Sequence, residues 1–358
     1  MIIVGLGWFW FHLNLWKIVI HFAIFANGFL LFHLQMQREI LMHGKMIYIF
    51  RNRPCKGLTF VENFNHGHRT WSIMLRPEGG SMDALVRRLR VFPRRTRATP
   101  WDDGVRIGEP GLFDRGMERV DVSVTFTWDL PKAERISALW AERAPTTIGG
   151  PAVGTVGQEF TPGEFLRTGY TITSRGCPER CWFCGAWKRD GAKARELPIR
   201  DGWNVLDDNL LACNEAHIRA VFAMLARQTR RVEFTGGLHA ARLKPWHVDL
   251  LCGLKPRPAI WLAYDEENDL DPLREACRML LAAGWTAESH RLRAYVLCGY
   301  PGDTQTTAEI RLRTAVAAGC TPMAMVYRGD GGVEAYGWHD WARQWIRPAC
   351  IHAANKVI

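Results

Sequence analysis

The stretch CPERCWFC places Cys177, Cys181 and Cys184 close together, with three residues between the first two and two between the last two. A structural zinc site closes four ligands, usually from two separated pairs, but the nearest downstream histidine is His217 and no second C-x-x-C pair occurs. A thioredoxin-like redox pair would leave Cys177 without a role. Three thiolates suit an iron-sulfur cluster better, because they hold three irons and leave the fourth open to a small-molecule ligand.

The segment around these cysteines has the rhythm of repeated β/α units. One helix is predicted from a stripe of Ile218, Val221, Phe222 and Leu225, and another from Asp271 as cap, Pro272 at the first position and Gly284 at the end. Apolar strand candidates lie at 169–174, 203–208, 231–235, 259–264, 292–299 and 322–327. Most intervals leave room for a crossover helix. The sequence therefore predicts an α/β fold, a partial (β/α)6 TIM-like barrel over 166–328, with the cysteines on the face formed by the strand C-termini.

A shorter α/β fragment, residues 82–165, precedes this barrel. Strands are predicted at 84–92, 120–128 and 145–152, with a helix over 131–143. The fragment is interpreted as doubly wound and is short for a complete nucleotide- or corrin-binding domain. After the barrel, Trp338, Trp341 and Trp345 recur at helical spacing and predict a C-terminal helical cap over 329–358.

Residues 1–81 do not match the rest of the chain. From Ile18 to Met36 the sequence is apolar enough for a marginal membrane span, and the basic residues that follow it would place the downstream chain in the cytoplasm. Segment 37–81 shows no sustained period. Two interpretations stay open. The segment is an irregular leader ahead of a true start at Met82, or it is a membrane anchor.

The composition excludes disorder, because 47% of the 358 residues are apolar and only 23% are charged. The other cysteines of the ten are scattered singly, which indicates a reducing, cytoplasmic compartment rather than a disulfide framework. The formal charge of +10 is uneven and favours either a phosphate-binding or a solvated basic segment. The basic run consists of Arg87, Arg88, Arg90, Arg94, Arg95 and Arg97.

The cysteine stretch resembles the C-x-x-x-C-x-φ-C signature of the radical S-adenosylmethionine (SAM) superfamily, with Phe183 as the aromatic position. The resemblance implies a [4Fe-4S] cluster on Cys177, Cys181 and Cys184, and SAM chelated to the unique iron. It also implies an external one-electron donor of the flavodoxin or ferredoxin type. In that family the reduced cluster cleaves SAM to a 5′-deoxyadenosyl radical, which abstracts hydrogen from the substrate.

Two further stretches support the resemblance. FTGGL, 234–238, is similar to the family's "GGE" turn, which implies SAM contacts by the backbone of Thr235, Gly236 and Gly237; Leu238 replaces the usual Glu. The resemblance also implies a SAM contact by Phe183 of the cysteine stretch. CGYPGDT, 298–304, resembles a loop that passes close to the adenosine, here through Gly299 and Gly302.

Polar residues at strand ends are further candidates for contacts to SAM or substrate. Asp207 and Asn209 follow the second strand, Asp265 the fourth and Arg328 the sixth. Asp207 and Asn209 have an alternative structural role as a turn or helix cap, and Arg328 has one as a surface residue. No catalytic residue is identified.

Family comparison limits the reaction more than it selects one. Only Cys55 lies upstream and only Cys350 lies after the barrel, so one cluster is expected. Cobalamin is not expected, because the chain lacks the D-x-H-x-x-G loop of the cobalamin-domain-associated branch. The resemblance implies a radical SAM enzyme acting on an unidentified substrate, with nucleic acid as one possibility. The alternative is a nonenzymatic metal- or nucleic-acid-binding protein on the same barrel.

Overall fold

The computed structural model describes residues 17–24, 30–37, 58–65, 68–75, 88–155, 159–329 and 332–355. The chain divides into two compact units, Met1–Leu85 and Val86–Ile358. This boundary lies four residues from the predicted change at Met82.

The first unit contains a four-stranded antiparallel sheet in the order β1-β2-β4-β3. Its strands are β1 (Lys17–Ile24), β2 (Leu30–Gln37), β3 (Leu58–Asn65) and β4 (His68–Leu75). The described parts of the apolar stretch 18–36, considered above as a marginal membrane span, are therefore strands, and β1 is rich in the β-branched residues that favour them. The expectation that 37–81 is irregular is also wrong, because β3 and β4 pair over their full lengths there.

A search of the described helices finds none with the length and apolar character needed to cross a membrane.

The second unit begins with a small parallel sheet in the order β6-β5-β7-β8. Its strands are β5 (Arg88–Phe92), β6 (Val105–Ile107), β7 (Arg119–Ser123) and β8 (Thr146–Gly149), with α1 (Leu130–Ala141) between the last two. Val91, Val120, Ile136 and Trp140 are fully buried where α1 packs on the sheet. The sequence predicted β5, β7, β8 and α1, but not the short β6.

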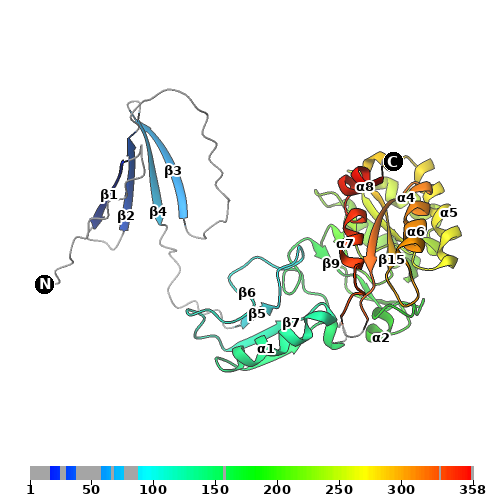
Figure 1. Cartoon of the computed structure of the whole chain (residues 1–358), viewed down its shortest axis with the longest axis horizontal. Helices are drawn as coiled ribbons and strands as arrows, with labels where there is room; N and C mark the ends of the chain where they lie inside the picture. The colour runs from blue at the N-terminus through cyan, green and yellow to red at the C-terminus, as the bar shows by residue number, and fades with distance from the viewer. Residues whose placement is uncertain are drawn as a thin grey trace. The chain divides into compact units, whose positions relative to one another are not determined.

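The larger sheet of this unit is parallel, and its six strands follow one another in chain order. Figure 1 labels two of them, β9 and β15. They are β9 (Tyr170–Thr171), β12 (Asn204–Val205), β13 (Glu233–Phe234), β14 (Ala259–Ala263), β15 (Leu292–Cys298) and β16 (Thr321–Val326). Each lies within, or one residue from, a predicted strand. The prediction of an α/β protein with parallel sheets is therefore confirmed. A small antiparallel pair, β10 (Ser174–Arg175) and β11 (Arg195–Glu196), flanks the cysteine segment.

Helices connect these strands. They are α2 (Ala186–Asp190), α3 (Glu215–Ala226), α4 (Pro245–Gly253), α5 (Leu270–Ala282) and α6 (Gln305–Ala317), followed by α7 (Trp338–Ala342) and α8 (Pro348–Asn355). The predicted stripe of α3 is buried. Helix α5 is capped by Asp269 rather than by the predicted Asp271, while Gly284 does end it, with a positive φ of 94°.

The two faces of the six-stranded sheet differ in character. Ile260 and Leu262 of β14 and Ala294 and Val296 of β15 belong to the main hydrophobic core, together with residues of α3 to α6. The alternating residues Trp261, Arg293 and Tyr295 lie on the other face. There the Arg293 guanidinium lies 5.4 Å from the Trp261 ring centre, and the Tyr295 hydroxyl donates to the Thr235 carbonyl at 3.0 Å. One face is thus apolar and packs against the helices, and the other is polar and aromatic.

The predicted C-terminal tryptophan stripe packs on this core. Trp338 and Trp345 are buried, and Trp341 is partly buried against the same cluster. Gly299 makes room for Trp338, because a Cβ there would lie 2.8 Å from the indole.

Because Leu262 is fully buried between sheet and helices, Leu262→Ala should lower the free energy of unfolding by about 3 kcal/mol. Urea denaturation measures this change. Ile310→Ala on α6 is the matched control: its side chain is 60% exposed, so the expected change is below about 0.5 kcal/mol. Equal effects of the two substitutions would contradict the assigned core.

Candidate functional site

The cysteine segment leaves β10, beside the C-terminal end of the first strand of the parallel sheet, and leads into α2. Gly176 precedes it with a φ of 87°, and a Cβ at that position would lie 2.3 Å from the Lys193 carbonyl oxygen. The Cys177 amide then donates to the Gly191 carbonyl at 3.1 Å. This close backbone approach folds the segment into a loop in which Cys177, Cys181 and Cys184 are all half-buried.

Asp207, which follows β12, hydrogen-bonds to the residues that lead into the cysteine loop. Its carboxylate accepts the Thr173 amide and the Thr173 hydroxyl, both at 2.6 Å, and the Ser174 hydroxyl at 2.8 Å. Burial raises the pKa of this carboxyl, while the same donors favour its ionised form. The geometry favours the structural role for Asp207.

Asp208 continues the same pattern one step along the chain. It accepts the Gly176 amide at 2.8 Å and pairs with Arg175 at 3.3 Å and Arg189 at 3.6 Å. Because Arg175 and Arg189 lie on either side of the cysteines, Asp208 ties the two ends of the loop together.

Asn209 completes the series by reaching the first cysteine. Its side-chain amide donates to the Cys177 sulfur at 3.4 Å. The side-chain carbonyl oxygen of Asn209 is buried and has no hydrogen-bond partner among the described residues. An unpartnered acceptor beside the cysteines suits a ligand that brings a hydrogen-bond donor. Of the polar residues predicted after β12, Asn209 is the one placed to meet a ligand.

Burial and the neighbouring thiols disfavour the ionised forms of Cys181 and Cys184. Burial, with the neighbouring thiols Cys184 and Cys177, raises the pKa of Cys181 to about 12. Burial also raises the pKa of Cys184, and Cys177 adds to the effect. Ionising all three together is costly unless a metal centre compensates the charge. No three His, Cys, Asp or Glu side chains in the described part of the chain are grouped tightly enough to hold a single metal ion. The donor set itself, three thiols, is the one an iron-sulfur cluster takes.

The predicted glycine turn follows β13. The Gly236 amide donates to Val205 at 2.9 Å and the Gly237 amide to Phe234 at 3.1 Å, so a ligand here would meet carbonyl oxygens rather than N–H groups. A Cβ on Gly236 would lie 2.7 Å from the Asp207 carbonyl oxygen, whereas at Gly237, with a φ of 91°, the nearest atom would be 3.8 Å away. Thr235 bonds to Asn204 through its side chain. Gly236 thus lets β13 approach the segment that carries Asp207.

The loop after β15 is held by Asp303. This buried carboxylate accepts the Gly299 amide at 2.8 Å and the Thr307 hydroxyl at 2.7 Å, and pairs with Arg311 at 2.7 Å. Burial opposes its ionisation, but Arg311 and the other donors leave the pKa of Asp303 below its usual value. Gly302 has a φ of 86°, and a Cβ on it would meet no described atom within 4 Å. The loop is held firmly at Gly299 and open at Gly302.

An aromatic cluster, which the sequence analysis did not identify, joins the cysteine loop to the last strands. Trp182, 46% exposed, makes ring contacts with Phe183 at 5.3 Å, Tyr300 at 5.9 Å and Tyr327 at 5.4 Å between centroids. The signal in the sequence was the aromatic pair inside the cysteine stretch. The contacts bring the loop after β9 together with segments that follow β15 and β16.

Asp265 lies at the end of β14 and accepts the Leu297 amide at 3.0 Å. Burial, with Asp269 and Glu266 nearby, raises the pKa of Asp265 to about 7. Arg328, the candidate after β16, is instead engaged by Glu334 and stacks 4.1 Å from the Trp128 ring centre. These contacts favour a structural role for Arg328, between the small sheet and the C-terminal segment.

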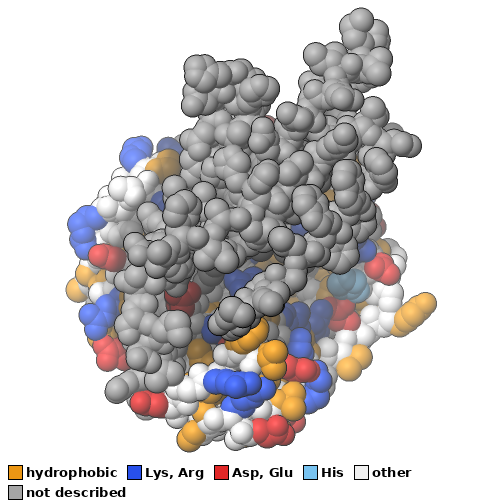
Figure 2. Space-filling model, turned by 90° about the vertical axis from the view of Figure 1, so that its left-hand side faces the viewer, with side chains coloured by type: hydrophobic (Ala, Val, Ile, Leu, Met, Phe, Trp, Pro, Cys, Tyr) orange, Lys and Arg blue, Asp and Glu red, His pale blue; other side chains and the backbone are white. Residues whose placement is uncertain are grey.

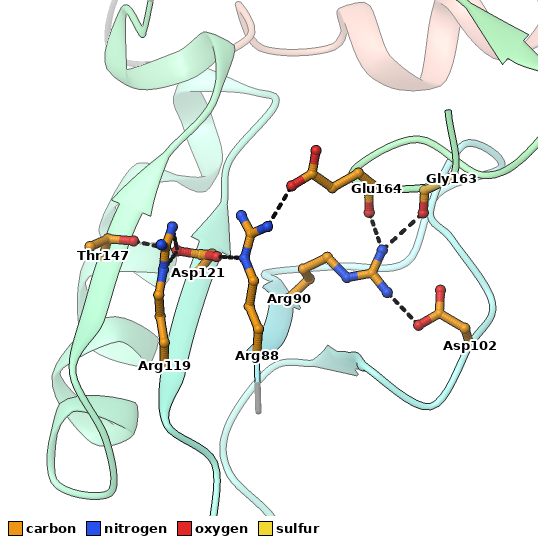
Figure 3. Close-up of polar contacts among 8 residues, drawn as sticks. All are labelled: Arg88, Arg90, Asp102, Arg119, Asp121, Thr147, Gly163 and Glu164. Atoms are coloured by element: carbon orange, nitrogen blue, oxygen red, sulfur yellow. Dashed lines mark hydrogen bonds and ion pairs between the residues drawn. The ribbon is translucent and has the colours of Figure 1, made fainter. Parts of the chain in front are cut away.

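Most of the described members of the basic run are paired within the protein. Figure 3 shows Arg88 between Asp121 and Glu164, and Arg90 bound to Asp102 and to the backbone carbonyls of Gly163 and Glu164. Arg94 makes a bidentate pair with Asp129, and Arg95 stacks on Trp101. Arg97 is the exception, with no carboxylate partner among the described residues; Arg87 lies outside the described residues. On the face that Figure 2 leaves visible, Lys and Arg are likewise interspersed with Asp and Glu.

Comparison with protein-family models, curated proteins and solved structures found no match to this chain.

The raised pKa of Asp265 makes stability depend on pH. The folded protein keeps a proton up to about pH 7 that the unfolded chain loses near 3.8, so stability is full below pH 3.8, falls as pH rises to about 7, and is constant above it. Asp265→Asn keeps an acceptor for Leu297 but cannot ionise. Between about pH 5 and pH 8 the wild type should lose about 2 kcal/mol more unfolding free energy than the variant.

Urea denaturation at the two pH values measures this difference. Asp271→Asn is the control, because that side chain is 91% exposed. Parallel pH profiles for wild type and Asp265→Asn would refute the assignment.

Proposed function

We propose that this protein is a radical SAM enzyme with one [4Fe-4S] cluster, acting on an unidentified substrate. The observation that carries the proposal is the position of the cysteine signature. Cys177, Cys181 and Cys184 lie on the loop after the first strand of a parallel sheet whose six strands run in chain order. Functional residues of such sheets gather at the strand C-termini.

The finer fold that accompanies this proposal is a partial (β/α)6 barrel. Sequential parallel strands, helices on one face and polar or aromatic residues on the other favour a sheet curved around its polar face. The Trp182 contacts also favour curvature, because they join the loop after β9 to the segments after β15 and β16, at the far end of the strand order.

The three cysteines would hold three irons of the cluster. The fourth iron would bind SAM, and the chemistry that such a cluster supplies is one-electron cleavage of SAM to methionine and a 5′-deoxyadenosyl radical able to take a hydrogen atom from the substrate. The electron has to come from an external donor of the flavodoxin or ferredoxin type. No second cluster and no cobalamin enters the proposal.

The remaining roles belong to the residues of the chain. The Asn209 carbonyl oxygen and the backbone carbonyls of Gly236 and Gly237 would accept hydrogen bonds from the SAM amino group. Gly237 and Gly302 leave room for backbone to approach the ligand. Trp182, with Phe183, Tyr300 and Tyr327, would cover the cysteine loop and exclude water.

The ligand assignment predicts that Cys177→Ala, Cys181→Ala or Cys184→Ala each abolishes the cluster and SAM cleavage, because three sulfurs are the minimum set. Anaerobically reconstituted protein with dithionite and SAM should form 5′-deoxyadenosine, measured by mass spectrometry, and each variant should form at least about 100-fold less.

Cys213→Ala is the matched control. Cys213 is half-buried and hydrogen-bonds to Ser174, so its loss should leave iron content and 5′-deoxyadenosine formation within about twofold of the wild type. Cleavage retained in any of the three variants would overturn the ligand assignment. An iron-loaded wild type that forms no 5′-deoxyadenosine would favour the nonenzymatic alternative.

A further inference from the structure

A hollow in the larger unit, away from the cysteine loop, carries a dense group of arginines. It has a volume of about 340 Å³. The residues that line it are Arg97, Arg167, Tyr170, Trp203, Asn204, Arg230, Arg231 and Glu233. One carboxylate therefore faces four guanidinium groups.

This hollow lies at the N-terminal ends of the strands, whereas the cysteine loop lies at their C-terminal ends. Tyr170, Asn204 and Glu233 are the first residues of β9, β12 and β13, and Asn204 is in register with both of the others. Because the strands are parallel, their first residues lie together at one end of the sheet and their last residues at the other end. The cysteine loop follows β9, so the hollow is separate from the proposed cluster site.

The charge of the four guanidinium groups is not balanced by nearby carboxylates. Among residues 88–155, 159–329 and 332–353, no carboxylate lies within ion-pair distance of any of the four, and the Glu233 carboxylate accepts the Asn204 amide at 3.3 Å. Elsewhere Arg88, Arg90, Arg94 and Arg311 all pair with carboxylates.

Two of these arginines are oriented by aromatic rings. The Arg230 guanidinium lies 4.8 Å from the Trp203 ring centre, and Arg167 lies 5.7 Å from that of Tyr170. Gly169 makes this arrangement possible, because a Cβ there would lie 2.0 Å from the Trp203 ring. These ring contacts restrict the Arg167 and Arg230 side chains, which reduces the entropy those two lose when a ligand binds.

We infer that this hollow binds the phosphate groups of a nucleotide-sized phosphorylated ligand. Guanidinium groups match phosphate oxygens with paired hydrogen bonds, and several converging arginines suit more than one phosphate charge. A volume of about 340 Å³ is at the size of small-ligand sites. The site explains why Arg97 has no carboxylate partner among the described residues when Arg88, Arg90 and Arg94 are neutralised. It goes beyond the proposed radical chemistry and does not depend on it.

Calorimetric titration of the full chain, without SAM or reductant, tests the site. The probes are inorganic pyrophosphate, ADP and a short single-stranded RNA. Arg230→Ala/Arg231→Ala removes two exposed cations and should weaken binding of pyrophosphate and ADP at least about tenfold. Arg274→Ala/Arg278→Ala, which removes the same charge from exposed positions on α5, should change binding less than about twofold.

The probes separate the sources of the phosphate. Tighter binding of ADP than of pyrophosphate supports a free nucleotide, whereas RNA binding lost in the same variant supports phosphates of a nucleic acid. Arg97→Gln, on a different segment, should weaken binding at least about threefold and serves if the double variant does not fold. The inference is overturned if the wild type binds none of the probes at about 1 mM, or if Arg97→Gln and the double variant bind like the wild type.

Discussion

The candidate site depends on three consecutive side chains that follow β12. Asp207 holds Thr173 and Ser174, Asp208 holds Arg175 and Gly176, and Asn209 reaches Cys177. The two segments therefore run side by side, and each step along one binds the next step along the other. Hydrogen bonds donated to buried carboxylates are strong because little water competes for them. This interaction fixes the start of the cysteine loop, and Trp182 of that loop contacts Tyr300 after β15 and Tyr327 after β16.

Different kinds of side chain gather at the two ends of the strands of the large sheet. At the C-terminal ends of the strands lie thiols, the buried Asn209 oxygen and a cover of aromatic rings. At the N-terminal ends of β9, β12 and β13 lie four arginines around a small hollow. The polar face of the sheet, which includes Trp261, Arg293 and Tyr295, lies between these two ends. A substrate with a phosphate group would be compatible with both ends of this arrangement.

Patterns local in the sequence predicted much of the fold, and contacts between distant residues account for what was missed. The six apolar runs of the large sheet and the stripe of α3 can be located because burial dictates the residue type at each position. The three-residue strand β6 is too short to show a period, and the paired strands of residues 58–75 carry mixed polar sequence. Sequence also placed Asp207, Asn209, Asp265 and Arg328 at strand ends. It could not separate them, because Asp207 is saturated by Thr173 and Ser174 and Arg328 stacks on Trp128, far away in the chain. The basic run was ambiguous for the same reason, since Asp102, Asp121, Asp129 and Glu164 decide which arginines are neutralised.

Mössbauer spectroscopy of the anaerobically reconstituted wild-type protein, recorded before and after SAM is added, tests the central claim most directly. The account predicts one four-iron cluster per chain, with a single iron whose signal changes when SAM binds. Tightly held zinc without a cluster, or a cluster whose four irons all ignore SAM, would contradict it.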